Sequence, residues 1–253
     1  MIKIVSFNLR CQWMGDGVNA FVHRVGFIYD KIRNEQPDVI AFQEMKEKFL
    51  ELLKKMFPEY AFYGSMRTAS YDGEGLYIAV RKETVSMLST DVFWLSPTPY
   101  VAGSRFEKQS TCPRVCVATK LRNLQTNEVF RVIDVHLDHI SDEARILSMR
   151  CLLSYVEESN ARDLLPTVIL GDFNATPNSE TIREMNAQSA FFEATKCVET
   201  TTFHNFGKLD DCKIDYIYVS KEWKNKKISV SLWQDEHEGI YLSDHYPLCA
   251  TIE

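Results

Sequence analysis

Hydrophobic residues follow two spacings along this chain, and each spacing predicts one kind of element. Short apolar runs rich in β-branched residues are typical of buried strands, whereas apolar residues three and four positions apart are typical of a helix face. The first pattern predicts strands at residues 2–8, 38–43, 114–121, 129–137, 167–170, 214–219, 228–233 and 246–252, with three or four more between 60 and 95. The second predicts helices between 19 and 37 and at 49–56, 141–158 and 179–185.

The first helix illustrates how its ends are predicted. Asn19 is a residue type that caps helices, and Pro37 follows the last helical position. The apolar residues between them fall at helical spacing, and they are Val22, Val25, Ile28 and Ile32. We therefore expect Asn19 to be the cap and these four residues to form the buried face.

Strands and helices alternate along the whole chain without a linker or a repeat of fixed period. This order predicts an α/β fold in which two mixed β-sheets pack together and helices cover their outer faces. We expect residues 1–253 to form a single domain, because no change in composition marks a boundary.

Composition and charge exclude several classes of protein. No apolar stretch is long enough to cross a bilayer, and Ser6, Asn8 and Arg10 interrupt the first apolar run, which is unlike a signal peptide. Seven cysteines without a framework spacing predict reduced thiols and a cytoplasmic protein. The formal net charge of −6 argues against a binder of long nucleic acid, whose affinity depends on a basic face. A short or small phosphorylated substrate stays compatible with this charge.

The strand at 167–170 carries the most informative chemistry. It is followed by Gly171, where either backbone or a ligand can approach closely, and then by Asp172 and Asn174. Positions two apart in extended chain face the same side, so both polar groups can reach one place. The alternative is an ordinary turn, since Asp, Asn and Pro177 all favour turns. What favours a site is that other predicted strands also end in polar residues.

Polar side chains end five further predicted strands or precede them. Because strands of stacked sheets have neighbouring ends, these groups are expected to converge on one edge. They are Asn8, Gln43, Glu44, His136, Asp138, Asp215, Asp244 and His245. Carboxylates and amides suit a hard divalent ion that retains water molecules, and the histidines are too dispersed for a zinc site. The sequence therefore predicts Mg²⁺ or Mn²⁺ together with a bound phosphate.

The ordered motifs resemble the endonuclease/exonuclease/phosphatase superfamily. The motifs are Ser6-Phe7-Asn8, Gln43-Glu44, His136-Leu137-Asp138-His139, Gly171-Asp172-Phe173-Asn174, Ile214-Asp215-Tyr216 and Ser243-Asp244-His245-Tyr246-Pro247. Within it, Phe93-Trp94-Leu95-Ser96 and Thr202-Phe203-His204 resemble a small bacterial subgroup of undefined substrate. The resemblance implies a four-layered α/β sandwich and metal-dependent cleavage of phosphate esters.

The resemblance also implies roles for individual residues. Glu44 is expected to be the principal metal ligand, with Asn8 and Asp244 assisting. Asp172 would activate or orient the attacking water, and Asn174 would fix that water or a phosphate oxygen. His245, held by Asp215, would stabilise the developing charge on the phosphoryl group. His136 and Arg114 would contact the phosphate from the other side, and Glu74 would orient His136.

These features predict a phosphodiesterase that acts on a nucleic-acid or nucleotide-like substrate, such as short DNA or RNA, by in-line attack of water. One alternative is a phosphatase or phosphodiesterase of a small phosphorylated sugar or lipid head group. A more distant one is a non-catalytic binding module. Three loops, at residues 10–17, 96–111 and 203–211, are expected to select the substrate. Asp138 and His139 are expected either to contact the substrate or only to shape the rim of the site, and His204 is expected to be structural.

Overall fold

The computed structural model describes residues 1–210 and 212–253, so Asp211, the last residue of the third expected loop, lies outside the described residues. One sheet contains β1 (Ile2–Asn8), β2 (Val39–Met45), β3 (Tyr60–Met66), β4 (Gly75–Arg81), β11 (Ile228–Leu232) and β14 (Leu248–Ile252). The other contains β5 (Val85–Trp94), β6 (Val115–Asn123), β7 (Val129–His136), β8 (Thr167–Asp172), β9 (Phe191–Glu193) and β10 (Asp215–Ser220). The strand orders are β11-β14-β1-β2-β4-β3 and β5-β6-β7-β8-β10-β9.

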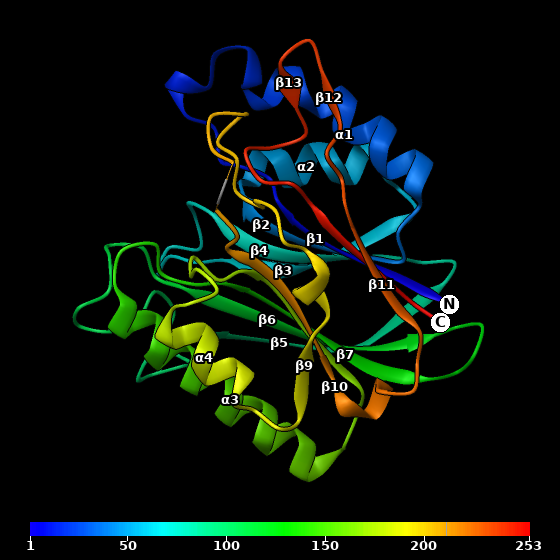
Figure 1. Ribbon diagram of the computed structural model, residues 1–253, viewed down its shortest axis with the longest axis vertical. Helices are drawn as coiled ribbons and strands as arrows, with labels where there is room; N and C mark the ends of the chain where they lie inside the picture. Colours follow the sequence, from blue (N-terminus) through cyan, green and yellow to red (C-terminus); the bar gives the residue numbers. More distant parts are fainter. Residues whose placement is uncertain (211) are drawn as a thin grey trace.

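Helices cover the outer face of each sheet. The α-helices are α1 (Phe21–Glu35), α2 (Glu47–Met56), α3 (Asp142–Arg162) and α4 (Glu180–Asn186). Figure 1 shows α1 and α2 on one side of the paired sheets and α3 and α4 on the other. Shorter elements are the 3₁₀ turns η1 (Met14–Asn19), η2 (Ala194–Cys197) and η3 (Lys221–Trp223), and a small hairpin of β12 (Glu236–His237) and β13 (Ile240–Tyr241). The expected arrangement of two mixed sheets between helices is thus confirmed.

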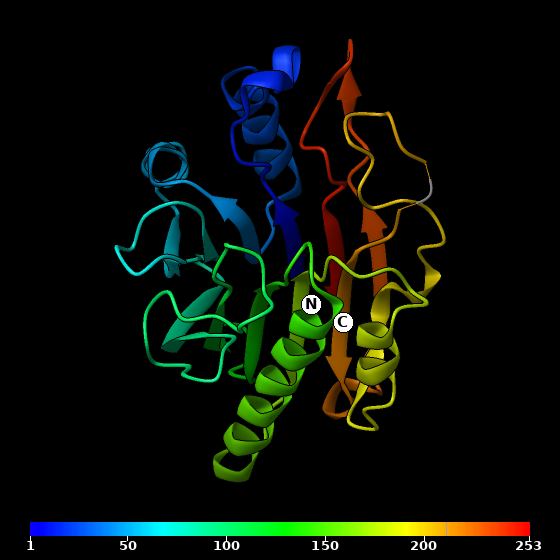
Figure 2. The same ribbon diagram turned by 90° about the vertical axis from the view of Figure 1, so that its left-hand side faces the viewer.

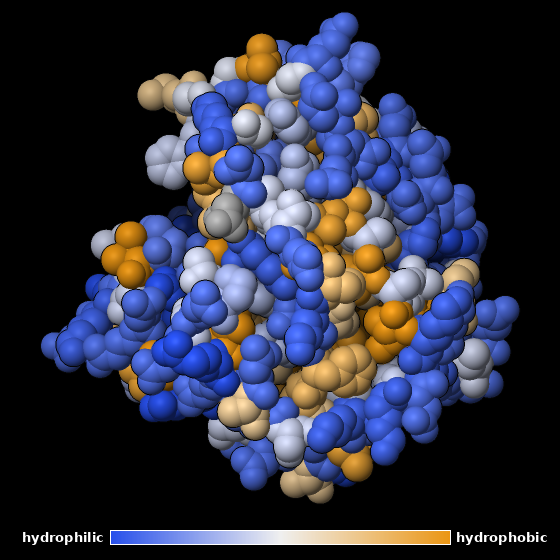
Figure 3. All heavy atoms as spheres, viewed as in Figure 1, coloured by the Kyte–Doolittle hydropathy of each residue, from blue (hydrophilic) through white to orange (hydrophobic). Residues whose placement is uncertain are grey.

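Three apolar clusters explain the four layers. The cluster between the sheets joins residues such as Ile4 and Ala41 from one sheet to Val132 and Leu170 from the other. A second cluster packs β1 and β2 against α1 and α2, and a third packs β7, β8 and β10 against α3 and α4. Each sheet therefore buries both faces, which is why its central strands are apolar runs rather than alternating patterns. Hydrophilic residues cover most of the surface seen in Figure 3, and the hydrophobic residues on this side gather mainly near its centre.

Two parallel strand pairs bring the polar strand ends to one edge. β1 runs parallel to β2, so Asn8 lies beside Gln43, and β7 runs parallel to β8, so His136 lies beside Asp172. β10 is antiparallel to β8, which places its first residue, Asp215, opposite Asp172. At the same end of the molecule, the segment 9–20, the β12–β13 hairpin and the loop that follows residue 199 rise above the sheets (Figures 1 and 2).

The expected cap of the first helix is wrong. Asn19 ends η1, the helix begins at Phe21, and its cap position, Ala20, makes no side-chain capping bond. The Asn19 amide instead donates to the Gly239 carbonyl at 2.9 Å and accepts from the Tyr241 N–H at 2.9 Å. Val22, expected on the buried face, is 69% exposed. Contacts with a hairpin more than two hundred residues away thus outweigh the local capping preference.

The strands predicted at residues 114–121 and 129–137 form the antiparallel pair β6 and β7. Among the described residues, no helix combines the length and the apolar character that a bilayer crossing requires.

Candidate active site

Asn8 connects the two sheets at the edge where their polar ends meet. Its side-chain amide nitrogen lies 3.1 Å from Oδ2 of Asp172 and 3.3 Å from Oε1 of Glu44. Its amide oxygen accepts the Arg10 N–H at 2.9 Å, which fixes the rotation of the amide. Asn8 and Asp172 are each 2% exposed. Two carboxylates from different sheets therefore share one amide donor.

A bulge in β2 turns Glu44 towards this amide. The pairing of β2 with β4 shifts between Phe42 and Met45, and Glu44 has a φ of 57°. Such bulges re-aim a side chain out of the strand's regular alternation. The Cys11 N–H donates to Glu44 Oε2 at 2.6 Å. Burial alone would raise the pKa of Glu44, but the Cys11 and Asn8 hydrogen bonds and the charge of His245 lower it, so the group is a carboxylate.

Gln43, the neighbour of Glu44, points between the sheets. Its amide nitrogen donates to Oδ1 of Asp134 at 2.7 Å, and both residues are fully buried. Burial raises the pKa of Asp134 well above its usual range. This bond joins the strand of Glu44 to the strand of His136 beneath the site.

Asp172 occupies the end of β8, directly after a close contact between strands. Gly171 has a φ of 137°, and a Cβ built there would lie 1.9 Å from the carbonyl oxygen of Val135. The expected close approach of a second backbone is confirmed, and no side chain fits. Burial first, and the neighbouring Asp215 carboxylate second, raise the pKa of Asp172 to about 7. Asp172 is thus poised to exchange a proton near neutral pH.

Two histidines approach Asp172 in different charge states. His245 Nδ1 lies 2.9 Å from Asp215 Oδ2, and its Nε2 lies 3.9 Å from Asp172 Oδ2. Burial would lower the pKa of His245, but the carboxylates of Asp215 and Asp172 raise it well above its ordinary value. His136 Nε2 lies 3.4 Å from the same Asp172 oxygen. Burial and the cationic Arg114 and Arg67 lower the pKa of His136, so it is neutral.

Asn174 meets Asp172 through its backbone rather than through the expected extended geometry. β8 ends at Asp172, and Asn174 has a left-handed φ of 48°. Its N–H donates to Asp172 Oδ1 at 2.8 Å, while its amide nitrogen donates to the Leu137 carbonyl at 3.0 Å. The alternation argument was therefore wrong in detail, because the chain turns after the strand. Contact of Asn174 with a bound water or phosphate stays a prediction.

Arg114 and Glu74 line a pocket beside Glu44 and His136. Arg114 is 3% exposed and its Nη2 lies 3.0 Å from His139 Nδ1, while its buried Nε and Nη1 have no hydrogen-bond partner among the described residues. Unpaired buried guanidinium donors are costly, and an anion would pair with them. Glu74, expected to orient His136, is instead bound by Arg67 at 2.7 Å, with Lys46 at 3.6 Å.

Asp244, expected to assist the metal, is held by an arginine. Arg10 Nη1 lies 3.2 Å from Asp244 Oδ2, and Arg10 Nη2 lies 3.1 Å from Asp16 Oδ1. Burial raises the pKa of Asp244 from its ordinary value. A metal contact of Asp244 would compete with the Arg10 ion pair, so this role stays a prediction.

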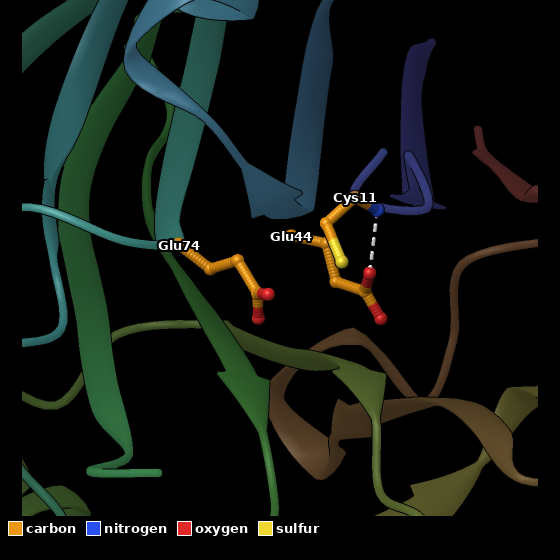
Figure 4. A group of neighbouring side chains, drawn as sticks. All are labelled: Cys11, Glu44 and Glu74. Carbon is orange, nitrogen blue, oxygen red and sulfur yellow. Dashed lines mark hydrogen bonds between the residues drawn. The ribbon is translucent and has the colours of Figure 1, made fainter. Parts of the chain in front are cut away.

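Charge at the site suits a divalent cation. Asp215 is matched by His245 and Asp244 by Arg10, whereas the described residues give Glu44 and Asp172 no dedicated cation. The side chains of Cys11, Glu44 and Glu74 offer ligand atoms within 4.8 Å of one another, as do those of Asp172, Asp215 and His245. Figure 4 shows the first group, with the three side chains arriving from separate segments. The carboxylate oxygens of these groups are ligands that a hard divalent ion prefers. Binding of the ion by Glu44 and Asn8 stays a prediction, because Asn8 presents its amide nitrogen to Glu44 and its oxygen accepts the Arg10 N–H.

Asp138, His139 and His204 lie around the catalytic cluster and differ in what they contact. Asp138 is fully buried and accepts the N–H groups of Ile140 and Ser141 at 2.9 and 2.8 Å, which supports its shaping the rim. His139 reaches Arg114, as described above. His204 stacks on Tyr246, with ring centroids 3.8 Å apart, which supports the structural interpretation.

Arg67 is a site residue that the sequence interpretation missed, whereas Arg10 was expected only as the first residue of a substrate-selecting loop. Arg10 follows the Asn8 motif by two positions, and Arg67 lies in a region interpreted as strands and turns. Both act through ion pairs with residues distant in the sequence or in another loop, as given above. Proximity of Arg10 to the Asn8 motif was the one available signal.

Comparison with known proteins is consistent with this geometry. Residues 5–245 match the Endonuclease/Exonuclease/phosphatase family. Human nocturnin is 21% identical over an alignment that covers 98% of this chain and 64% of nocturnin, so the chain spans just under two thirds of that relative. An endonuclease/exonuclease/phosphatase structure from Bacteroides vulgatus matches with a TM-score of 0.89 and 25% identity, covering 100% of this chain and 98% of that one. A mannosyl-6-phosphatase structure from Bacteroides thetaiotaomicron matches with a TM-score of 0.87 and 21% identity, covering 100% of both chains.

Proposed function

We propose that this chain, which belongs to the endonuclease/exonuclease/phosphatase family of phosphoester hydrolases, cleaves a phosphodiester in a nucleic-acid or nucleotide-like substrate with the help of Mg²⁺ or Mn²⁺. The observation that carries the proposal is the shared amide of Asn8, which holds Glu44 and Asp172 from two sheets around one point. We further propose that residues 1–253 act as one catalytic unit, and that it works in the cytoplasm, where seven cysteines stay reduced.

Asp172 is the proposed base. Its pKa of about 7 lets it accept a proton from the attacking water, and the Asn174 N–H holds one carboxylate oxygen at 2.8 Å. Positioned general bases of this kind contribute about 10²- to 10⁴-fold to a rate.

His245, His136 and Arg114 are proposed to surround the phosphoryl oxygens. The Asp215 carboxylate keeps His245 protonated, so its Nε2–H can donate to an oxygen that gains charge in the transition state. Nε and Nη1 of Arg114, which have no partner among the described residues, can supply further donors. His136, which is neutral, can donate one hydrogen bond without adding charge.

Glu44 and Asn8 would hold the divalent ion, with Asp244 a further candidate once released by Arg10. The bound ion would supply Lewis-acid stabilisation of the negative charge on the phosphate. Asn8 would in addition keep Glu44 and Asp172 at a fixed separation.

A phosphatase of a small sugar phosphate is the second candidate. Two observations favour it: the match to the mannosyl-6-phosphatase over the full length of both chains, and the net charge of −6, which disfavours long nucleic acid.

A substrate panel with and without a chelator tests these proposals. It includes bis(p-nitrophenyl) phosphate, p-nitrophenyl phosphate, a dinucleotide and a hexose 6-phosphate, each with Mg²⁺ or Mn²⁺. The first proposal predicts faster metal-dependent turnover of the two diesters, all of it lost on chelation. Faster turnover of the two monoesters would support the second candidate, and no turnover of any substrate would contradict both.

A further inference from the structure

A cleft outside the catalytic cluster lies between two of the loops that rise above the sheets. Its volume is about 480 Å³. One wall comes from the segment after β1 and the other from the segment that follows His204. The lining residues are Arg10, Trp13, Gly15, Asp16, Gly17, Val18, Asn19, Asn205, Phe206 and Lys208. Most of this lining belongs to the loops 10–17 and 203–211, which were expected to select the substrate, and Arg10 also belongs to the catalytic cluster.

Asp244 ties both walls to the catalytic cluster. Its carboxylate pairs with Arg10 of the first wall at 3.2 Å. Its carbonyl oxygen accepts the N–H groups of His204 and Asn205, which begin the second wall, at 2.9 and 3.0 Å. Because His245 is the next residue in the chain, the cleft and the catalytic histidine are built on the same anchor. A ligand in the cleft would therefore have a fixed position relative to the reacting phosphate.

Trp13 presents an exposed aromatic surface at this cleft. It is 60% exposed, whereas Trp94, Trp223 and Trp233 are 4%, 2% and 3% exposed. The backbone N–H of Trp13 donates to Asp16 Oδ2 at 3.1 Å, and its indole N–H donates to the sulfur of Cys11 at 3.0 Å. The Arg10 guanidinium lies 5.8 Å from the ring centroid. The indole is thus held in place while most of its surface remains available, as in side chains on which bases stack.

The polar groups of the cleft that remain available come mainly from the second wall. Asp16 and Asn19 already bond to Arg10 and to the β12–β13 hairpin. Within the described parts of the chain, the side chains of Asn205 and Lys208 make no hydrogen bond, and the buried Nε of Arg10 has no partner. An amide and an ammonium group beside an aromatic surface can bind the edge of a planar, acceptor-rich ring.

We propose that this cleft binds the nucleobase of a nucleotide-like substrate, with the ring stacked on Trp13 and its edge facing Asn205 and Lys208. The inference rests on the proposed function in placing the phosphate near Glu44. The two regions are adjacent: the Cys11 N–H binds Glu44, Trp13 follows two residues later, and Arg10 lines the cleft while it pairs with Asp244.

Quenching of tryptophan fluorescence by iodide tests the proposal without relying on turnover, because Trp13 is the tryptophan that iodide can reach. The protein carries Asp172→Asn to prevent hydrolysis, and the probes are adenosine 5′-monophosphate, ribose 5-phosphate and mannose 6-phosphate, each with Mg²⁺. We expect adenosine monophosphate to lower the quenching constant at least twofold and the two sugar phosphates to leave it unchanged. Trp13→Phe should abolish the quenchable component.

Calorimetry with the same probes provides the second measurement. Trp13→Ala should weaken adenosine monophosphate binding about tenfold, and leave ribose 5-phosphate binding unchanged. Met14→Ala is the matched control, since Met14 is fully exposed on the same loop and does not line the cleft. Equal protection of Trp13 by mannose 6-phosphate would overturn the nucleobase in favour of a sugar. Absence of protection by any probe, in a protein whose wild type still hydrolyses bis(p-nitrophenyl) phosphate, would overturn the cleft assignment and leave the proposed function standing.

Discussion

Nδ1 of His245 lies 2.9 Å from Oδ2 of Asp215, and this contact determines the charge of the imidazole. The carboxylate fixes which ring nitrogen faces the site, and it keeps the ring protonated despite burial. Strand β10 places Asp215 opposite Asp172, and His245 reaches them from the segment before β14, where it forms a single bridge with Phe203.

Asp215→Asn should therefore reduce turnover and alter its pH dependence. We expect kcat to fall about 100-fold, within the range of acid–base groups. Because Asp215 raises the pKa of His245, the variant should lose the imidazolium at a lower pH, so the alkaline limb of the kcat profile should shift to lower pH. Asp30→Asn, an exposed position on α1, is the control. An unchanged alkaline limb would contradict the role of Asp215.

Glu44→Gln should weaken metal binding more than Glu74→Gln does. Glu44 faces the site without a dedicated cation, whereas Arg67 and Lys46 already neutralise Glu74. We expect calorimetric titration with Mn²⁺ to show at least a tenfold loss of affinity in Glu44→Gln and a smaller loss in Glu74→Gln. The reverse order would move the metal towards Glu74.

Gly171→Ala should destabilise the fold, because its Cβ would lie 1.9 Å from the Val135 carbonyl oxygen. We expect the free energy of unfolding in urea to fall by at least about 2 kcal/mol, more than a typical substitution. Gly26→Ala in α1 is the matched control: nothing lies within 4 Å of its added Cβ, and it should gain about 0.5–1 kcal/mol. Equal stability of the two variants would contradict the close strand contact.

Asp138→Asn should change stability in a pH-dependent manner. Burial raises the pKa of Asp138, but hydrogen bonds from Ser110, Ser141 and Ile140 lower it overall. A group with a depressed folded-state pKa stabilises the protein above its unfolded pKa, about 3.9, and loses that contribution as pH falls through the lower folded value. We expect the variant to be about 2 kcal/mol less stable at pH 7, with the difference shrinking below about pH 4. A constant difference across this range would refute the carboxylate's contribution.

Apolar patterning was sufficient to predict both sheets and the edge where Asn8, Asp172 and Asp215 meet, because strand order along one edge follows from local pattern and parallel pairing. It predicted Glu44 at this edge but not the bulge that turns its side chain, because the bulge depends on pairing with β4. It also failed for Asn19, whose partners are Gly239 and Tyr241, 220 and 222 positions away in the chain. Such contacts are decided by the packing of loops, which residue spacing does not encode.

The most direct test of the account is the Mg²⁺-dependent hydrolysis of bis(p-nitrophenyl) phosphate by the wild type, Glu44→Gln and Asp172→Asn, measured in parallel with their melting temperatures. If the two carboxylates that share the Asn8 amide form the catalytic centre, both variants should melt close to the wild type and lose about 100-fold or more in kcat/KM. Wild-type turnover by either folded variant would contradict the account.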